Sequence, residues 1–162
     1  FGTGLHPTTR LCLVACERLV RAGMRVLDVG TGSGILAIAA AKLGAASVVA
    51  LDVDSVAVEV ARRNCSMNGL DEWIQVLHGS LERLPADAAG GFDLVLANIT
   101  AGVLVDLARG LRDALAPSGL LVASGIIAER EEQLRLALEG AGIALDEIAL
   151  EGDWRAMVGR RV

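Results

Sequence analysis

The residues best suited to chemistry follow one short apolar segment. The sequence DVGTGSG, residues 28–34, comes directly after that segment and leads into an apolar helical pattern. Glycines at this spacing allow a tight strand-to-helix turn and let a ligand approach the backbone, because a Cβ would fill the space. The segment predicts a loop for a nucleotide-like ligand, with Asp28, Gly30 and Gly32 as candidate cofactor-binding residues.

Two phosphate-binding motifs do not fit this loop. The dinucleotide fingerprint GxGxxG requires a glycine where this chain has Ile35, and the P-loop requires Gly-Lys-Ser or Gly-Lys-Thr, which is absent. A loop without lysine suits a ligand without phosphates. A nicotinamide-dependent dehydrogenase is therefore a distant alternative, which NADH binding would revive.

Polar residues that follow other apolar segments extend the candidate site. Asp52 lies 20 residues after Gly32, where an acidic side chain can accept hydrogen bonds from both hydroxyls of a ribose. Ser80 would line the adenine side, with a plain turn as the alternative. Asn98 can accept a hydrogen bond from an amine and orient it, although it could instead cap the next helix.

Alternating strand-like and helix-like segments must position these residues. Short β-branched runs alternate with longer helical patterns, which is typical of βαβ units and a mostly parallel sheet. We expect strands at 25–29, 47–52, 74–78, 93–98 and 120–124, and a final hairpin at 143–150 and 154–162. We expect helices at 8–21, 35–43, 56–68, 101–116 and 128–140. One domain covers residues 1–162.

Composition argues against several classes of partner. A net charge of −5 gives no basic surface for a phosphate backbone, so we expect no direct contact with nucleic acid. Apolar runs fall well short of the ~20 residues that span a bilayer and no signal-peptide pattern is present, so we expect no membrane partner and a cytoplasmic location. Cys12, Cys16 and Cys65 form no CxxC pair, which favours reduced structural thiols and no metal.

Several segments together resemble one family. The segments FGTGLHPTTRL, DVGTGSGILAIAAAKLGA, LDVD, LANITAG, SGII and GDW are distributed over essentially the whole chain and resemble the bacterial ribosomal protein L11 methyltransferase family. The resemblance implies an α/β, Rossmann-like class I methyltransferase fold with a seven-stranded mostly parallel sheet, a C-terminal antiparallel hairpin and helices on both faces. It also implies S-adenosylmethionine as cofactor and methylation of amino groups of a large-subunit ribosomal protein. The N-terminal substrate-recognition domain of the family is missing from these residues.

The resemblance also assigns roles to single residues. It implies that Thr9 in the opening loop binds the cofactor together with Gly30, Asp52 and Asn98, and that Phe1 lies in the active-site loop near the methyl donor. Thr100 departs from the family, which usually has an apolar or aromatic residue there; this leaves the expected cofactor site intact and the geometry around the acceptor open.

In-line methyl transfer requires a neutral amine held close to the donor. We assign Asn98 the role of orienting that amine, expect its proton to pass to water, and expect Phe1 and Trp154 to shield the site. His6 is interpreted as incidental, with a role as base as the alternative. Methylation of another protein or a small molecule, or donor binding without independent catalysis, remain alternatives. Methylation of a nucleobase is disfavoured because residues 99–101 lack the prolines and aromatic residue that stack a flipped base.

Overall fold

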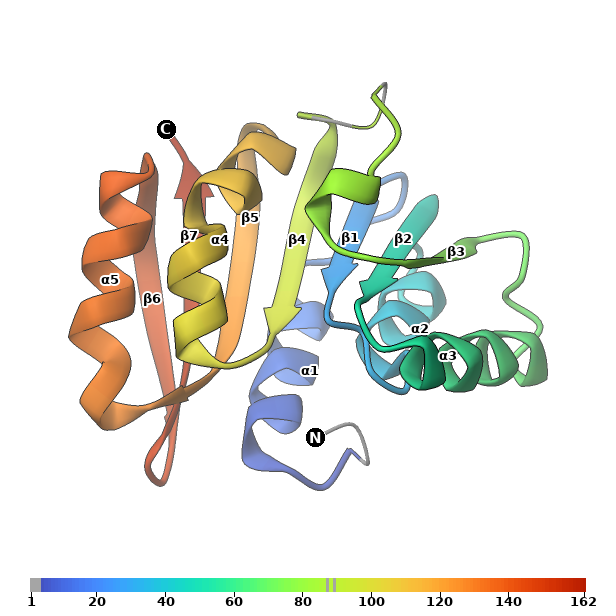
Figure 1. Ribbon diagram of the computed structural model, residues 1–162, viewed down its shortest axis with the longest axis horizontal. Coiled ribbons are helices and arrows are strands. Elements are labelled where there is room, and N and C mark those ends of the chain that lie inside the picture. Colours follow the sequence, from blue (N-terminus) through green and yellow to red (C-terminus); the bar gives the residue numbers. More distant parts are fainter. Residues whose placement is uncertain (1–3, 87, 89) are drawn as a thin grey trace.

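Strands and helices alternate along the part of the chain that this computed structural model describes, residues 4–86, 88 and 90–162 (Figure 1). The strands are β1 (Arg25–Val29), β2 (Ser47–Asp52), β3 (Ile74–His78), β4 (Phe92–Asn98), β5 (Leu115–Ile127), β6 (Ile143–Glu151) and β7 (Trp154–Arg161). The α-helices are α1 (Pro7–Leu19), α2 (Ile35–Lys42), α3 (Ser55–Met67), α4 (Ala101–Ala114) and α5 (Glu131–Gly140), and the short 3-10 turns are η1 (Leu81–Arg83) and η2 (Ala128–Arg130).

The strands form one sheet in the order β3-β2-β1-β4-β5-β7-β6. β7 is antiparallel to both of its neighbours, and the remaining pairs are parallel. The expected fold, a mostly parallel seven-stranded sheet with a C-terminal hairpin, is confirmed.

The chain leaves β1 toward β2 and later returns to the other side of β1 with β4. The carboxyl ends of β1 and β4 therefore form the topological switch point, where open α/β sheets bind ligands.

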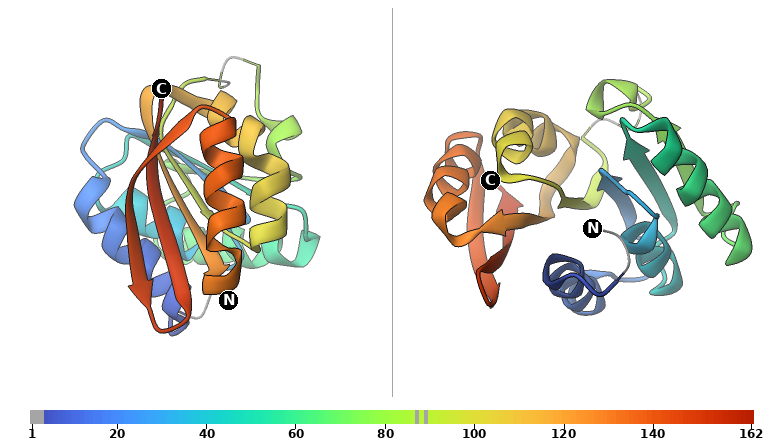
Figure 2. Two further views of the ribbon diagram at one scale, coloured as in Figure 1. Left: turned by 90° about the vertical axis from the view of Figure 1, so that its left-hand side faces the viewer. Right: turned by 60° about the horizontal axis from the view of Figure 1, so that its bottom comes forward.

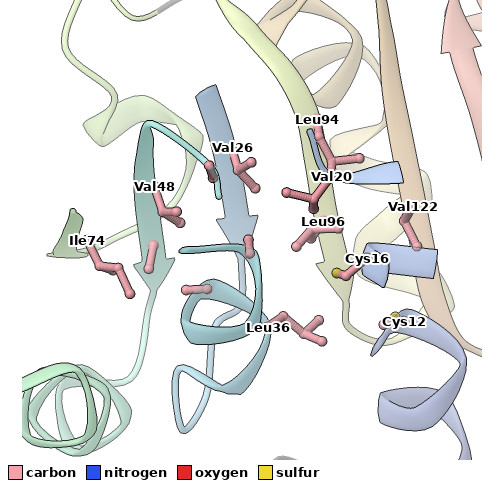
Figure 3. Close-up of a cluster of buried hydrophobic side chains, with 14 of the residues drawn as sticks. Cys12, Cys16, Val20, Val26, Leu36, Val48, Ile74, Leu94, Leu96 and Val122 are labelled. Atoms are coloured by element: carbon pink, nitrogen blue, oxygen red, sulfur yellow. The ribbon is translucent and has the colours of Figure 1, made fainter. Parts of the chain in front are cut away.

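Helices cover both faces of the sheet. α1, α2 and α3 pack on one face, and α4 and α5 pack on the other (Figure 2). Figure 3 shows the core on the first face, where Leu36 of α2 meets side chains of α1 and of the central strands. α2 is apolar along most of its length, and its buried residues Ala37 and Ala40 are small enough to allow close approach to the sheet.

The cysteines are part of this core. Cys12, Cys16 and Cys65 are free and buried, as the sequence indicated. Burial raises the pKa of the Cys16 thiol to about 12 and raises the pKa of Cys12 as well. Both thiols therefore stay protonated near neutral pH and pack as small apolar side chains.

The largest departure from the expected elements lies around Pro117. The helix expected to reach residue 116 ends at Ala114, and β5 runs from Leu115 to Ile127 instead of covering only 120–124. Proline disfavours helical backbone in the residue before it, and Ser118 has a positive φ of 61°. The register with β4 consequently shifts between the Phe92↔Leu115 pair and the next pair along the strand. A smaller departure concerns α5. The helix expected from residue 128 begins at Glu131, and residues 128–130 form the 3-10 turn η2 instead.

Candidate functional site

A cavity of about 400 Å³ opens at the switch point, at the carboxyl ends of β1, β2 and β4. A smaller cavity of about 50 Å³ adjoins it, and both are lined by Gly30, Gly32 and Asn98. We call the two together the switch-point cavity. Asp52 and Ser80 line the larger part, and Thr9 lines the smaller part. The fold therefore brings residues predicted from five separate sequence segments to one place.

The glycine-rich loop is held by hydrogen bonds to β2 and by packing against the segment after β4. The amides of Gly30 and Thr31 donate to the carbonyl of Leu51 at 2.8 and 2.9 Å. Gly30 has a positive φ of 71°, and a Cβ there would overlap the Cγ2 methyl of Ile99. Only glycine combines this backbone conformation with such close packing, so the loop stays tight against the cavity floor.

Asp28 lies beneath this loop and does not line the cavity. Its side chain is 1% exposed, and its Oδ2 accepts hydrogen bonds from Thr31 Oγ1 at 2.6 Å and from the amide of Ala37 at 3.2 Å. These bonds tie the loop to the first turn of α2. These contacts suit a residue that positions the loop, and the contact with the ligand that the sequence suggested for Asp28 stays a prediction.

Burial raises the pKa of Asp28 from 3.8 to about 6, although the hydrogen bonds from Thr31 and Ala37 oppose the shift. Between these two values the folded chain keeps a proton that the unfolded chain has already released. The free energy of unfolding therefore falls as the pH rises through that window.

Asp52 stands at the edge of the cavity with both carboxylate oxygens held by the backbone. Oδ2 accepts from the amide of Gly32 at 2.9 Å, and Oδ1 accepts from the amide of Asp54 at 3.0 Å. A carboxylate offers about four acceptor positions, so two remain for a ligand. Asp54 caps α3 by accepting from the amide of Val56 at 2.9 Å, which leaves Asp52 free of that task.

Asn98 carries an unsatisfied acceptor. Its Nδ2 donates to Thr9 Oγ1 at 3.4 Å, which is long for a hydrogen bond, and its Oδ1 is buried without a partner among the described residues. A buried acceptor without a donor destabilises the fold by about 1 to 3 kcal/mol. Because Asn98 lines both parts of the cavity, a donor group placed there could satisfy its Oδ1. Thr100, and not Asn98, is the N-cap of α4, which removes the capping alternative.

The opening segment meets the final strand beside this site. His6 is the N-cap of α1, where its Nδ1 accepts from the amide of Thr8 at 3.3 Å. The rings of His6 and Trp154 are in an edge-to-face contact with centroids 4.7 Å apart. Trp154 does not line the switch-point cavity but a neighbouring one that shares Thr100 with it. The shielding predicted for Phe1 falls on a residue outside the described part of the chain.

Sequence reasoning missed the apolar rim of the cavity. Val53, Val103 and Leu107 line it, and Val53 and Val103 are 71% and 45% exposed. Exposed apolar side chains beside a ribose-binding position suit the flat face of an aromatic base. The four-residue spacing of Val103 and Leu107 on one helix face and the valine directly after Asp52 were the available signals.

The order and directions of the strands are those of the Rossmann-like fold found in S-adenosylmethionine-dependent methyltransferases. The fold is shared with such a methyltransferase from Aquifex aeolicus, which is 24% identical with a TM-score of 0.78 over 97% of this chain and 94% of that chain. The family model described as ribosomal protein L11 methyltransferase (PrmA) matches residues 1–162, and the chain belongs to this family.

Two relatives illustrate the similarity at higher identity. The crystal structure of ribosomal protein L11 methylase from Lactobacillus delbrueckii subsp. bulgaricus is 36% identical, with a TM-score of 0.90 over 98% of this chain and 81% of that chain. Ribosomal protein L11 methyltransferase of Geobacter metallireducens is 51% identical over 159 residues, which cover 98% of this chain and 50% of the relative. The chain spans about half the length of the curated relatives it matches.

Proposed function

We propose that the protein carrying this chain transfers methyl groups from S-adenosylmethionine to amino groups of ribosomal protein L11. The observation that carries the proposal is the unpartnered, buried Oδ1 of Asn98 between the two parts of the switch-point cavity. An amide oxygen in that position can accept a hydrogen bond from an amine and orient its lone pair. Membership of the family supplies the acceptor protein.

The residues around the cavity fit S-adenosylmethionine. Asp52 would accept from the ribose hydroxyls, and the apolar side chains of Val53 and Leu107 would pack on the adenine. Thr9 and the backbone of the glycine-rich loop would hold the methionine end in the smaller part of the cavity. The loop has no lysine, which agrees with a ligand that has no phosphates.

S-adenosylmethionine supplies an electrophilic methyl group attached to a sulfonium. The chain's own contribution is placement: Asn98 aims the acceptor amine, while Ile99 and Thr100 close the cavity around it. Among the described residues that line the switch-point cavity, Asp52 alone has an ionisable side chain. Two of its acceptor positions are already used by backbone amides. We therefore assign the loss of the amine proton to water rather than to a general base.

The acceptor and location follow from the same proposal. A ribosomal protein is met where ribosomes assemble, so we propose that the protein acts in the cytoplasm. Among the described residues, no helix combines the length and the apolar character needed to cross a membrane. We further propose that these 162 residues form the catalytic domain and that recognition of the acceptor involves additional residues, which the relatives' greater length provides.

The test uses unmodified ribosomal protein L11 with S-adenosylmethionine and intact mass as the readout. Two enzymes are compared: the 162-residue chain, and a chimera in which this chain replaces the matching half of the Geobacter metallireducens relative. We expect added methyl masses with the chimera, and methylation by the chain alone would place recognition within it as well. An unchanged mass with both enzymes, while donor binding is measured in the same samples, would refute methylation of this acceptor.

A further inference from the structure

A second cavity of about 410 Å³ lies beside the switch-point cavity, lined by Thr100, Ala101, Gly102, Gly125, Ile127, Arg130 and Trp154. We call it the β5 cavity, because it lies at the carboxyl end of β5. In Figure 1 this is the lower edge of the sheet, where α4 begins and the β6–β7 turn lies. Thr100 lines both cavities and is two residues from Asn98. The β5 cavity therefore adjoins the switch-point cavity at Thr100, close in sequence to the amide that we propose orients the acceptor.

Apolar groups form two walls of the β5 cavity. Ile127 is 40% exposed although its neighbour Ile126 is fully buried, and Trp154 presents its indole on the opposite strand, where Ile127 and Trp154 are register partners. Apolar walls of this kind suit the methylene chain of a long side chain such as lysine.

The remaining wall carries positive charge. Among the described residues that line the β5 cavity, Arg130 alone has an ionisable side chain. Within the described part of the chain it forms no ion pair. Its Nη2 lies 3.8 Å from the position of a Cβ built on Gly102, in the first turn of α4. That turn contains no acidic residue, and Thr100 caps it without a side-chain hydrogen bond, so the positive end of the helix faces the same space.

The carboxylates closest in sequence to the cavity residues either form ion pairs elsewhere or do not line the cavity. Glu131 Oε2 pairs with Arg155 Nε at 2.7 Å, and Glu151 pairs with Arg10. Glu129 and Asp153 flank the cavity in sequence but do not line it. The lining of the β5 cavity thus combines an apolar channel with one available guanidinium and offers it no carboxylate.

From these observations, and resting on the proposed methyl transfer, we propose that the β5 cavity admits the amine-bearing side chain of the acceptor and that Arg130 selects acceptors in which a carboxylate flanks that amine. The neutral amine's lone pair forms the new N–C bond as the donor's S–C bond breaks. The electron pair of the broken bond stays on sulfur, and the methylated ammonium then releases its proton to water. Arg130 pairs with the flanking carboxylate and is a specificity-determining residue that takes no part in this step.

Trp154 provides a direct readout of occupancy. The chain contains two tryptophans, and Trp73 directly precedes β3 and lines neither cavity. In a W73F background, all tryptophan fluorescence comes from Trp154, which lines the β5 cavity and also contacts His6. The W73F chain, saturated with S-adenosylhomocysteine, is titrated with three short peptides that each contain one lysine flanked by glutamate, glutamine or a second positive charge from arginine.

We expect the glutamate-flanked peptide to bind about 3- to 10-fold more tightly than the glutamine-flanked one at low salt, and the preference to shrink as salt is raised. R130Q should abolish the preference, and R130E should reverse it in favour of the arginine-flanked peptide. R63E is the matched control, because Arg63 is exposed on α3 and lines neither cavity. It should leave the order of affinities unchanged.

Two results would overturn the proposal: an unchanged order of affinities in R130E, or no response of Trp154 to any peptide. Either of these together with continued methylation of ribosomal protein L11 would leave the proposed function standing and place the acceptor elsewhere. A reversed order in R130E without methylation of that protein by the chimera would support the β5 cavity and reject the proposed acceptor protein.

Discussion

Gly32→Ala and Gly23→Ala form a matched pair that separates backbone strain from loss of ligand space. Gly32 has a φ of 57° and Gly23 a φ of 87°, and a Cβ on either residue would meet no atom within 4 Å. Both substitutions force alanine into a left-handed conformation, which destabilises by about 1 to 2 kcal/mol. Gly23 lies in the turn before β1, whereas Gly32 lines both parts of the switch-point cavity.

The two variants should therefore lose similar stability and differ in ligand binding. The open space at Gly32 belongs to the cavity, so an added methyl there competes with the ligand, and the amide of Gly32 also helps to hold Asp52. We expect G32A to weaken binding of S-adenosylhomocysteine at least about 10-fold, which corresponds to ~1.4 kcal/mol. G23A should bind it like the unmodified chain.

Chemical denaturation measures the stability of both variants, and isothermal titration calorimetry measures their affinity for S-adenosylhomocysteine at a temperature where both are folded. Equal affinities in G32A and G23A, with comparable losses of stability, would refute the assignment of the glycine-rich loop as a ligand-binding surface. A much larger loss of stability in G32A than in G23A would show that the space at Gly32 is not open.

Three other substitutions test the roles assigned around the cavity. D52N should weaken donor binding by roughly 10- to 100-fold in calorimetry, since it removes the charge that strengthens hydrogen bonds to the ribose; an unchanged affinity would remove Asp52 from the donor site. N98A should lower kcat about 100-fold while changing donor affinity far less, because it removes orientation of the acceptor; equal losses in both would contradict that role. D28N should remove the fall in the free energy of unfolding between pH 4 and 6, because the pKa of Asp28 rises from 3.8 to about 6 on folding, and the change amounts to about 3 kcal/mol at most. Denaturation curves for both proteins across this pH range give the result, and parallel profiles would reject the buried, titrating Asp28.

The sequence predicted most of the site because parallel strands bring their carboxyl ends to one edge of the sheet. Gly30 directly follows a recognisable strand, and Asp52 and Asn98 are the last residues of two others, so their convergence could be expected from the sequence. Thr9 was placed by the family resemblance alone, and its contact with Asn98 depends on how α1 packs across the sheet.

Other features depended on tertiary packing that short-range patterns do not encode. Asp28 belongs to the same sequence motif as the loop, but the surrounding helices and strands bury it. Its side chain therefore accepts a hydrogen bond from Thr31 of the loop. Arg130 and Trp154 lie in segments remote from the glycine-rich loop, and only the pairing of β5 with β7 brings them together. The early start of β5 was also missed, although Pro117 was a visible signal that α4 must end before it.

The most direct test of the central claim is to locate transferred methyl groups chemically. Ribosomal protein L11 is incubated with the chimera and S-adenosylmethionine labelled in its methyl group, then hydrolysed and separated into amino acids. We predict that the label appears on nitrogen, as methylated lysine or as a methylated N-terminal residue. Label absent from this protein while the chimera binds the donor, or label released entirely as methanol by mild base before the hydrolysis, would contradict amino-group methylation at the switch-point cavity.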